Sequence, residues 1–111
     1  MKDNKKIPIQ VKLPEDIVVW IDYSAEKKYL KRGPTTRMYL IEALSSIHKA
    51  DLRQLEFSFN HKIMLSTILI AFEVPKDIND KLLDLCKYIP VSKKKLAEIL
   101  ICQIVDKMRE V

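Results

Sequence analysis

Residues 7–17 read IPIQVKLPEDI, and residues 68–78 read ILIAFEVPKDI, so one pattern occurs twice with a shift of 61 positions. Apolar residues occupy every second position of both stretches up to a proline, which is the pattern of a β-strand with one buried face. The proline lacks a backbone N–H and suits the start of a helix, where the acidic residues that follow are also favoured. Each copy therefore predicts a strand that stops at proline and leads directly into a helix.

The composition is that of a folded protein. Of the 111 residues, 48% are hydrophobic and 32% are charged, which allows one compact domain or two small merged units. The single glycine argues against a glycine-rich phosphate loop. No window approaches the roughly 18 apolar residues that span a bilayer, and the basic start leads into a strand rather than into a signal peptide. We therefore expect a cytoplasmic protein without membrane contact.

The charge points toward an anionic partner. The net charge is +5 and the isoelectric point is near 9.2, which favours nucleic acid, with ordinary solubilising charge as an equal alternative on this ground alone. Residues 1–6 form a short basic arm, in which Lys5 and Lys6 are candidates for phosphate contact. The alternative for this arm is a frayed terminus.

Nothing in the sequence indicates catalysis. Cys86 and Cys102 lie in apolar helical patterns without a nearby second cysteine, so we expect them to be small buried hydrophobic residues. His48 and His61 have no metal-ligand spacing around them. There is no nucleophile paired with a base and no cluster of metal ligands. We expect no enzyme activity, no metal, no cofactor and no small-molecule ligand.

Each predicted strand is followed by two predicted helices. In the first copy, the first helix is expected to end near residues 29–30, with Gly33 in the left-handed conformation that stops a helix and Pro34 preventing continuation. Thr35 is the expected N-cap of a second helix that is apolar almost all round. In the second copy, Pro90 ends the first helix and Ser92 caps the second.

The repeat divides the chain. Residues 7–48 form the first repeat, 67–111 the second, and 49–66 an apolar connector whose structure the sequence leaves open. Thr35 corresponds to Ser92 with a shift of 57 rather than 61, which predicts four extra residues, about one helical turn, before the second helix of the first copy.

A strand with two helices cannot bury its own apolar surface, whereas two such copies can. We therefore predict an α+β fold. Its two strands pair antiparallel into a ribbon, and the two apolar second helices pack against each other beneath it, giving four helices in all.

This order of elements resembles the ribbon-helix-helix family of DNA-binding regulators. The resemblance is carried by residues 9–17 and 33–44 and by their counterparts 70–78 and 91–97. Most members are homodimers with one copy per chain, and this sequence is similar to the tandem form found in some regulators encoded by archaeal viruses. The resemblance implies an intramolecular pseudo-dimer of two ribbon-helix-helix repeats, acting in the cytoplasm, or in the host cytoplasm if the source is viral.

In that family the ribbon enters the major groove and its outward side chains read base edges. The outward positions of the first copy are Pro8, Gln10 and Lys12. Gln10 can bond adenine, and Lys12 can reach guanine or a phosphate. A solvated strand residue is the alternative for each.

The second copy departs from this pattern, because its outward positions are Leu69, Ala71 and Glu73. The first two suit thymine methyl groups and Glu73 suits cytosine N4, although it repels phosphate. Our hypothesis is an asymmetric ribbon in which the first copy makes most base contacts. The alternative is that this face is covered by another protein or by the segment around Phe57 and Phe59.

The starts of the two second helices are the predicted phosphate contacts. They comprise Thr35, Thr36 and Arg37 in the first copy and Ser92, Lys93, Lys94 and Lys95 in the second. Free backbone N–H groups, a positive dipole end and nearby cations favour a phosphate there, and family members similarly hold the DNA backbone at this point. Three lysines oppose the helix dipole, so phosphate binding or solubility explains them better than helix stability does.

The resemblance therefore implies a sequence-specific regulator of transcription, a repressor, that binds double-stranded DNA. The alternative is a protein-interaction module of the same fold, an antitoxin-like or dimerisation unit that does not read DNA, which the apolar outward face of the second copy favours. Both functions are compatible if chains assemble side by side along DNA.

Overall fold

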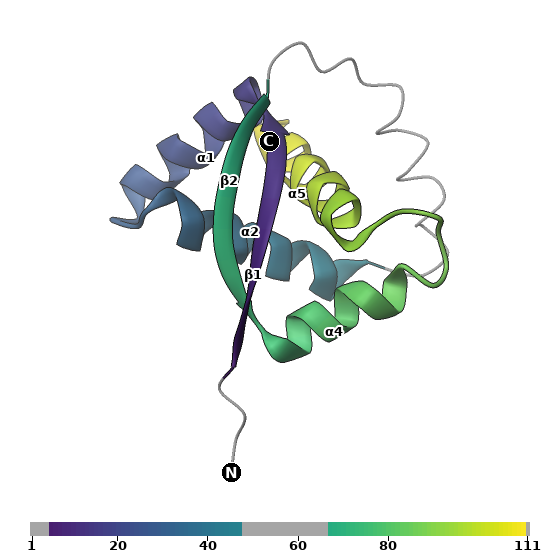
Figure 1. Cartoon of the computed structure of the whole chain (residues 1–111). Coiled ribbons are helices and arrows are strands. Elements are labelled where there is room, and N and C mark those ends of the chain that lie inside the picture. Colours follow the sequence, from purple (N-terminus) through teal and green to yellow (C-terminus); the bar gives the residue numbers. More distant parts are fainter. Residues whose placement is uncertain (1–4, 48–66, 111) are drawn as a thin grey trace.

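A computed structural model of the chain describes residues 5–47 and 67–110. The described elements, in order, are β1 (Lys6–Pro14), α1 (Glu15–Lys27), α2 (Arg32–Ser46), β2 (Thr67–Pro75), α4 (Lys76–Leu85) and α5 (Lys93–Arg109). This part of the chain is α+β, with a two-stranded antiparallel sheet and four helices, as predicted (Figure 1). In both copies the strand ends at the proline and the helix begins at the next residue.

The two strands form a ribbon with a definite centre. Gln10 lies opposite Ala71, with Pro8 opposite Glu73 on one side and Lys12 opposite Leu69 on the other. Since Gln10 and Ala71 are themselves 61 positions apart, this central pair maps onto itself when the two copies are exchanged. A pseudo-two-fold axis therefore passes through the middle of the ribbon.

The alternation of apolar residues gives the ribbon one buried face. Its buried members are Ile9, Val11, Leu13, Ile70, Phe72 and Val74. This face rests on α2 and α5, which cross behind the ribbon (Figure 1). Burying a large aliphatic side chain contributes about 1.5–3 kcal/mol to folding, so this layer stabilises the ribbon against the helices.

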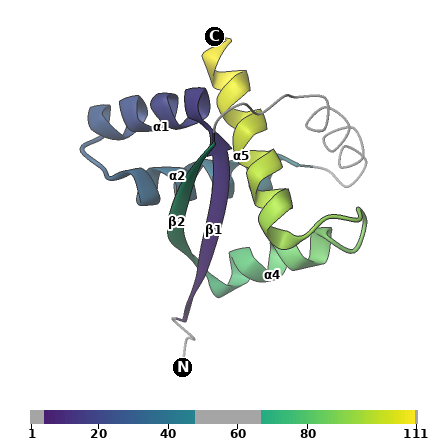
Figure 2. The same ribbon diagram turned by 45° about the horizontal axis from the view of Figure 1, so that its top comes forward.

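The two copies are intertwined. Of the two strands, α2 from the first copy packs on β2 and α5 from the second copy packs on β1. α2 and α5 also pack extensively on each other. Both helices lie on the buried face of the ribbon (Figures 1 and 2). Each long helix thus covers the strand of the other copy, and neither copy has a separate core.

The predicted all-round burial of the second helices is confirmed for α5 and wrong for part of α2. Every residue from Leu96 to Cys102 is buried. In α2, by contrast, Met38 is 41% exposed. The residue of α5 that corresponds to Met38 is Ile99, which is only 2% exposed.

The predicted turn between α1 and α2 is wrong in its details. α1 ends at Lys27, and the left-handed residue is Tyr29, with φ 57°. This conformation allows the Leu30 N–H to donate to the Ala25 carbonyl at 2.9 Å, which closes the helix. Gly33 instead lies in the first turn of α2. A Cβ there would lie 3.4 Å from the Ala71 carbonyl oxygen, an ordinary van der Waals distance, so the first turn of α2 lies next to β2.

The predicted four-residue difference between the copies is also wrong. α2 begins at Arg32 and α5 at Lys93, again 61 positions apart. The N-cap residues are Lys31 and Ser92, and the Ser92 hydroxyl accepts the Lys95 N–H at 3.1 Å, as predicted for Ser92. Thr35 is not a cap, because its hydroxyl donates to the Lys31 carbonyl one turn earlier.

Several sequence predictions fall outside the described residues, namely those on residues 1–4, the connector 49–66, His48 and His61. Lys6, predicted to belong to the arm, is the first residue of β1 and pairs with Pro75. Among the described helices, none is long and apolar enough to span a bilayer.

Candidate nucleic-acid interface

The six predicted base-reading residues share one exposed face of the ribbon. They form three cross-strand pairs, Pro8–Glu73, Gln10–Ala71 and Lys12–Leu69, and every member is exposed. The outward placement predicted from alternation is therefore confirmed. Leu69, with 52% of its surface exposed, is the large apolar side chain of this face.

The two strands offer different chemistry on this face. β1 presents hydrogen-bond donors, the Gln10 amide and the Lys12 ammonium. β2 presents the Glu73 carboxylate, an acceptor, together with the methyl groups of Leu69 and Ala71. Base edges in the major groove display acceptors, donors and a thymine methyl group, all of which this mixed face can meet.

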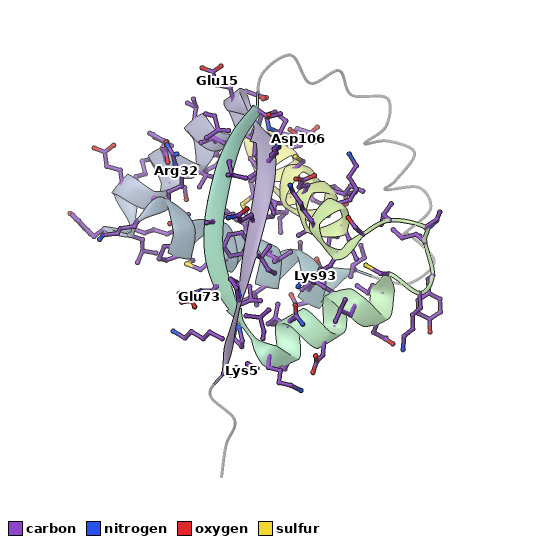
Figure 3. All side chains as sticks on the ribbon, in the orientation of Figure 1. Lys5, Glu15, Arg32, Glu73, Lys93 and Asp106 are labelled. Carbon is purple, nitrogen blue, oxygen red and sulfur yellow. The ribbon has the colours of Figure 1, made fainter. Side chains whose placement is uncertain are left out.

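A helix N-terminus flanks each edge of the ribbon. Arg32 of α2 and Lys93 of α5 lie on opposite sides of the two strands (Figure 3). Gly33, in the first turn of α2, lies next to Ala71 and Phe72 of β2. On the other edge, Glu98 brings α5 against β1, because its Oε2 accepts the backbone N–H of Lys12 at 2.7 Å.

The start of α5 keeps the features predicted for a phosphate contact. The Ser92 hydroxyl accepts a hydrogen bond from the Lys95 N–H. The first-turn N–H groups without a helical acceptor are therefore those of Lys93 and Lys94. Lys94 is exposed and Lys95 is half-buried. Lys93 is half-buried as well, and its Nζ donates to Asn79 Oδ1 of α4 at 2.7 Å, which holds the ammonium beside the helix start.

The start of α2 differs from the prediction. Thr35 and Thr36 are fully buried, and their hydroxyls donate to the Lys31 and Arg32 carbonyl oxygens at 2.9 and 2.8 Å. Their side chains therefore cannot contact a phosphate, and that prediction is wrong for both. The reason is that this turn lies inside the helix, against the core, rather than at its first residue.

Arg32 is the cation at this helix start that sequence reasoning missed. Its guanidinium binds both carboxylate oxygens of Asp22 in α1, at 2.8 and 2.6 Å. The hydrogen bonds from Arg32 hold the pKa of Asp22 below its ordinary value, and the same bonds raise the pKa of Arg32. The sequence pattern indicated that α2 begins at Thr35. The helix in fact begins at Arg32, which places this side chain at the helix N-terminus.

Arg37, a predicted phosphate contact, lies beside the ribbon. It is half-buried, and its Nη1 donates to the Glu73 carbonyl oxygen at 3.4 Å. Arg37 and Glu98 are 61 positions apart, as are Glu73 and Lys12, so these two edge contacts occupy equivalent places. At one edge a cation meets a strand carbonyl, and at the other a carboxylate meets a strand amide.

Glu98 is the second residue that sequence reasoning missed. It lies among the apolar residues of α5 and is only 7% exposed. A lone carboxylate in a buried helical stretch needs a hydrogen-bond donor, and this requirement was the signal available in the sequence. The donor itself lies 86 positions away, so only the fold reveals it.

The cysteines belong to the packing around this site. Cys102 is buried and Cys86 half-buried, close to the prediction for both. Burial raises the pKa of the Cys86 thiol, against the opposing effect of the Lys93 charge. Within residues 5–47 and 67–110, no group of three His, Cys, Asp or Glu side chains is placed to hold a metal ion.

Comparisons of the chain with protein-family models, with curated proteins and with solved structures gave no match. Its function must therefore be inferred from its own residues and their arrangement.

Proposed function

We propose that the protein is a tandem ribbon-helix-helix regulator that inserts its ribbon into the major groove of double-stranded DNA. The observation that supports this most is the combination of one exposed ribbon face with a helix N-terminus at each edge. A two-stranded ribbon fits the width of the major groove. The flanking helix starts then meet the phosphates on either side, where their dipoles and cations favour an anion.

The exposed residues divide into two roles under this proposal. Gln10 and Lys12 donate to base edges, while Glu73 accepts from cytosine N4. Lys94, the exposed lysine of the α5 start, contacts a phosphate, together with the adjacent backbone amides. Arg37 supplies positive charge at the other edge, beside β2.

Occupation of a promoter by such a protein excludes other proteins from the same groove and backbone. We therefore propose repression of transcription in the cytoplasm, the host cytoplasm if the source is viral, as its biological role. Lys5 and Lys6 add two cations at the start of β1 that extend the phosphate contacts beyond the ribbon.

A second candidate function is supported by Leu69. A leucine that is 52% exposed on a ribbon face, next to the exposed Ala71, also suits contact with a protein. In that case the fold is an interaction module, and the exposed face of β2 binds a protein partner. The protein would have both functions, DNA binding and protein interaction, if neighbouring chains contacted each other along DNA.

The deciding experiment measures binding to mixed-sequence duplex DNA at several salt concentrations. The matched variants are Lys94→Ala, at the start of α5, and Lys107→Ala, an exposed lysine in its last turn. Replacing Lys93 is avoided, because the buried Asn79 would lose its bond to Lys93.

We expect wild-type binding with a steep salt dependence, because each phosphate contact releases counterions. Lys94→Ala should lower the slope of log affinity against log salt by about one, whereas Lys107→Ala should leave it unchanged. If the wild type bound no duplex even at low salt, the DNA proposal would be overturned and the interaction module would replace it.

A further inference from the structure

The pseudo-two-fold axis makes the two strands directly comparable. It passes through the Gln10–Ala71 pair, and it relates Lys12 of β1 to Glu73 of β2. A symmetric dimer would have identical side chains at these related positions. Here the axis exchanges a cation for an anion on the face that is proposed to read DNA.

The same difference runs along the whole exposed face. The basic side chains on the outward positions of the described ribbon, Lys6 and Lys12, both belong to β1. The outward positions of β2 are Thr67, Leu69, Ala71, Glu73 and Pro75. The cationic donors are thus concentrated on β1, whereas β2 carries apolar groups, one hydroxyl and one carboxylate.

The supporting helices repeat this asymmetry independently. The start of α5 carries Lys93, Lys94 and Lys95 beside β1, and the related start of α2 carries Arg32, Gly33 and Pro34 beside β2. The Arg32 charge is paired with Asp22, whereas Lys94 is exposed at the start of α5. The first turn of α5 therefore offers more cationic charge to a phosphate than the first turn of α2, whereas Arg37 beside β2 and Glu98 beside β1 act in the opposite sense.

From these observations we infer that the chain recognises a non-palindromic duplex site in one orientation; this inference rests on the proposed DNA-binding function. In a two-fold symmetric dimer, both half-sites meet the same residues, so the site is palindromic. In this chain, β1 and the α5 start select purine acceptors and bind the backbone tightly. Glu73, Leu69 and Ala71 select cytosine N4 and thymine methyl groups in the other half.

Glu73 also restricts where the β2 half can bind. A carboxylate in the groove is favourable beside a cytosine N4 donor and unfavourable beside the acceptors of guanine or thymine. The β1 half of the site, if presented to β2, would therefore be rejected. Rejection of this kind is what prevents the chain from binding its site in the reverse direction.

The test starts by selecting tight binders from a random duplex pool with the wild-type protein. The selected site is then compared with two palindromes, each built by duplicating one of its halves. We expect the selected site to bind at least about tenfold more tightly than either palindrome, since mismatched base pairs reduce affinity strongly. Equal or tighter binding to one of the palindromes would overturn the inference and leave the proposed function standing.

A symmetrised variant provides the second arm. Ala71→Gln with Glu73→Lys gives β2 the central residues of β1, and both positions are exposed, so the core is unchanged. We expect this variant to bind the palindrome of the β1 half more tightly than the selected site. The control is Glu42→Lys, an exposed position in the second half of α2 with the same change in charge, which should keep the wild-type preference.

The outcomes separate the two proposals. If the symmetrised variant kept the wild-type preference, one-directional reading by the ribbon would be overturned. If the wild type bound no duplex at low salt, the proposed function and the inference would fall together. Selective binding to the non-palindromic site, with the preference changed only by the ribbon substitutions, would support both.

Discussion

The two copies agree at the centre of the core and differ along the edges of the ribbon. Leu40 and Ile101, 61 positions apart in α2 and α5, are both fully buried. The edge residues Arg37 and Glu98, related by the same shift, have opposite charges. The interior has to be filled from both sides at once, so most of its positions are apolar in both copies. The ribbon edges can differ because each needs only a local polar partner.

The largest expected effect is on the free energy of unfolding, and it tests whether the two copies share one core. Leu40→Ala and Ile101→Ala should each lower the free energy of unfolding by about 2–5 kcal/mol, because each removes buried methyl groups and leaves a cavity. Urea denaturation followed by circular dichroism measures this. Met38→Ala, at an exposed position of α2, is the control and should change stability little. Two separate unfolding transitions in either variant would contradict the intertwined arrangement.

The next effect concerns the two edges. Glu98→Ala should lower the free energy of unfolding by about 1.5–3 kcal/mol, because the Lys12 N–H loses a charged acceptor in a buried place. Arg37→Ala should cost less than about 1 kcal/mol, since its bond to the Glu73 carbonyl is long, at 3.4 Å, and exposed. Urea denaturation of each variant measures these two changes in the free energy of unfolding.

Glu98→Gln is the matched control for the β1 edge. It keeps an oxygen acceptor for the Lys12 N–H, so it should recover part of the stability lost in Glu98→Ala. Equal losses for Glu98→Ala and Arg37→Ala would show that the two edges are energetically alike.

A smaller effect separates the two strands in DNA binding. Lys12→Ala should weaken binding to the selected duplex by about tenfold, because a donor to a base or phosphate is lost. Its backbone bond to Glu98 is retained, so the fold is preserved. Glu73→Ala should strengthen binding to unselected duplexes, because it removes an anion that repels phosphate. Fluorescence anisotropy measures both, and changes in the same direction would contradict the assignment.

The smallest expected effect comes from the ion pair between Asp22 and Arg32 in the first copy. Hydrogen bonding to Arg32 lowers the pKa of Asp22, so the pair stabilises the fold at pH values above the ordinary carboxyl pKa. This stabilisation is lost as the pH falls through the lowered pKa of the folded state. Because both side chains are partly exposed, Asp22→Asn should cost at most about 1 kcal/mol at neutral pH.

Urea midpoints at neutral and acidic pH measure this contribution. The difference between the wild type and Asp22→Asn should disappear in acid, when Asp22 is protonated. The position related to Asp22 in the second copy is Leu83, which is exposed. Leu83→Asn is therefore the control and should show no such dependence on pH. A difference for Asp22→Asn that persisted in acid would exclude the ion pair as its cause.

Local patterns were enough to predict the ribbon and its exposed face. Alternation assigned Gln10 and Ala71 to the outward side of the strands, and the repeat predicted antiparallel pairing. Ser92 was recognisable as a cap because serine before a helix has one strongly preferred role. Thr35 was wrongly predicted to be a cap. A buried threonine can also donate to the carbonyl one turn earlier, so it does not always mark a helix start.

The sequence by itself determined the strands, the prolines that end them, and the presence of two equivalent copies, because these features depend on neighbours along the chain. The tertiary structure decided which helix covers which strand, the true start of α2, and the partners of Arg32 and Glu98. Those features depend on residues that meet only after the copies intertwine. Lys12 and Glu98, 86 positions apart, form one such contact, and no local preference of either residue specifies the other.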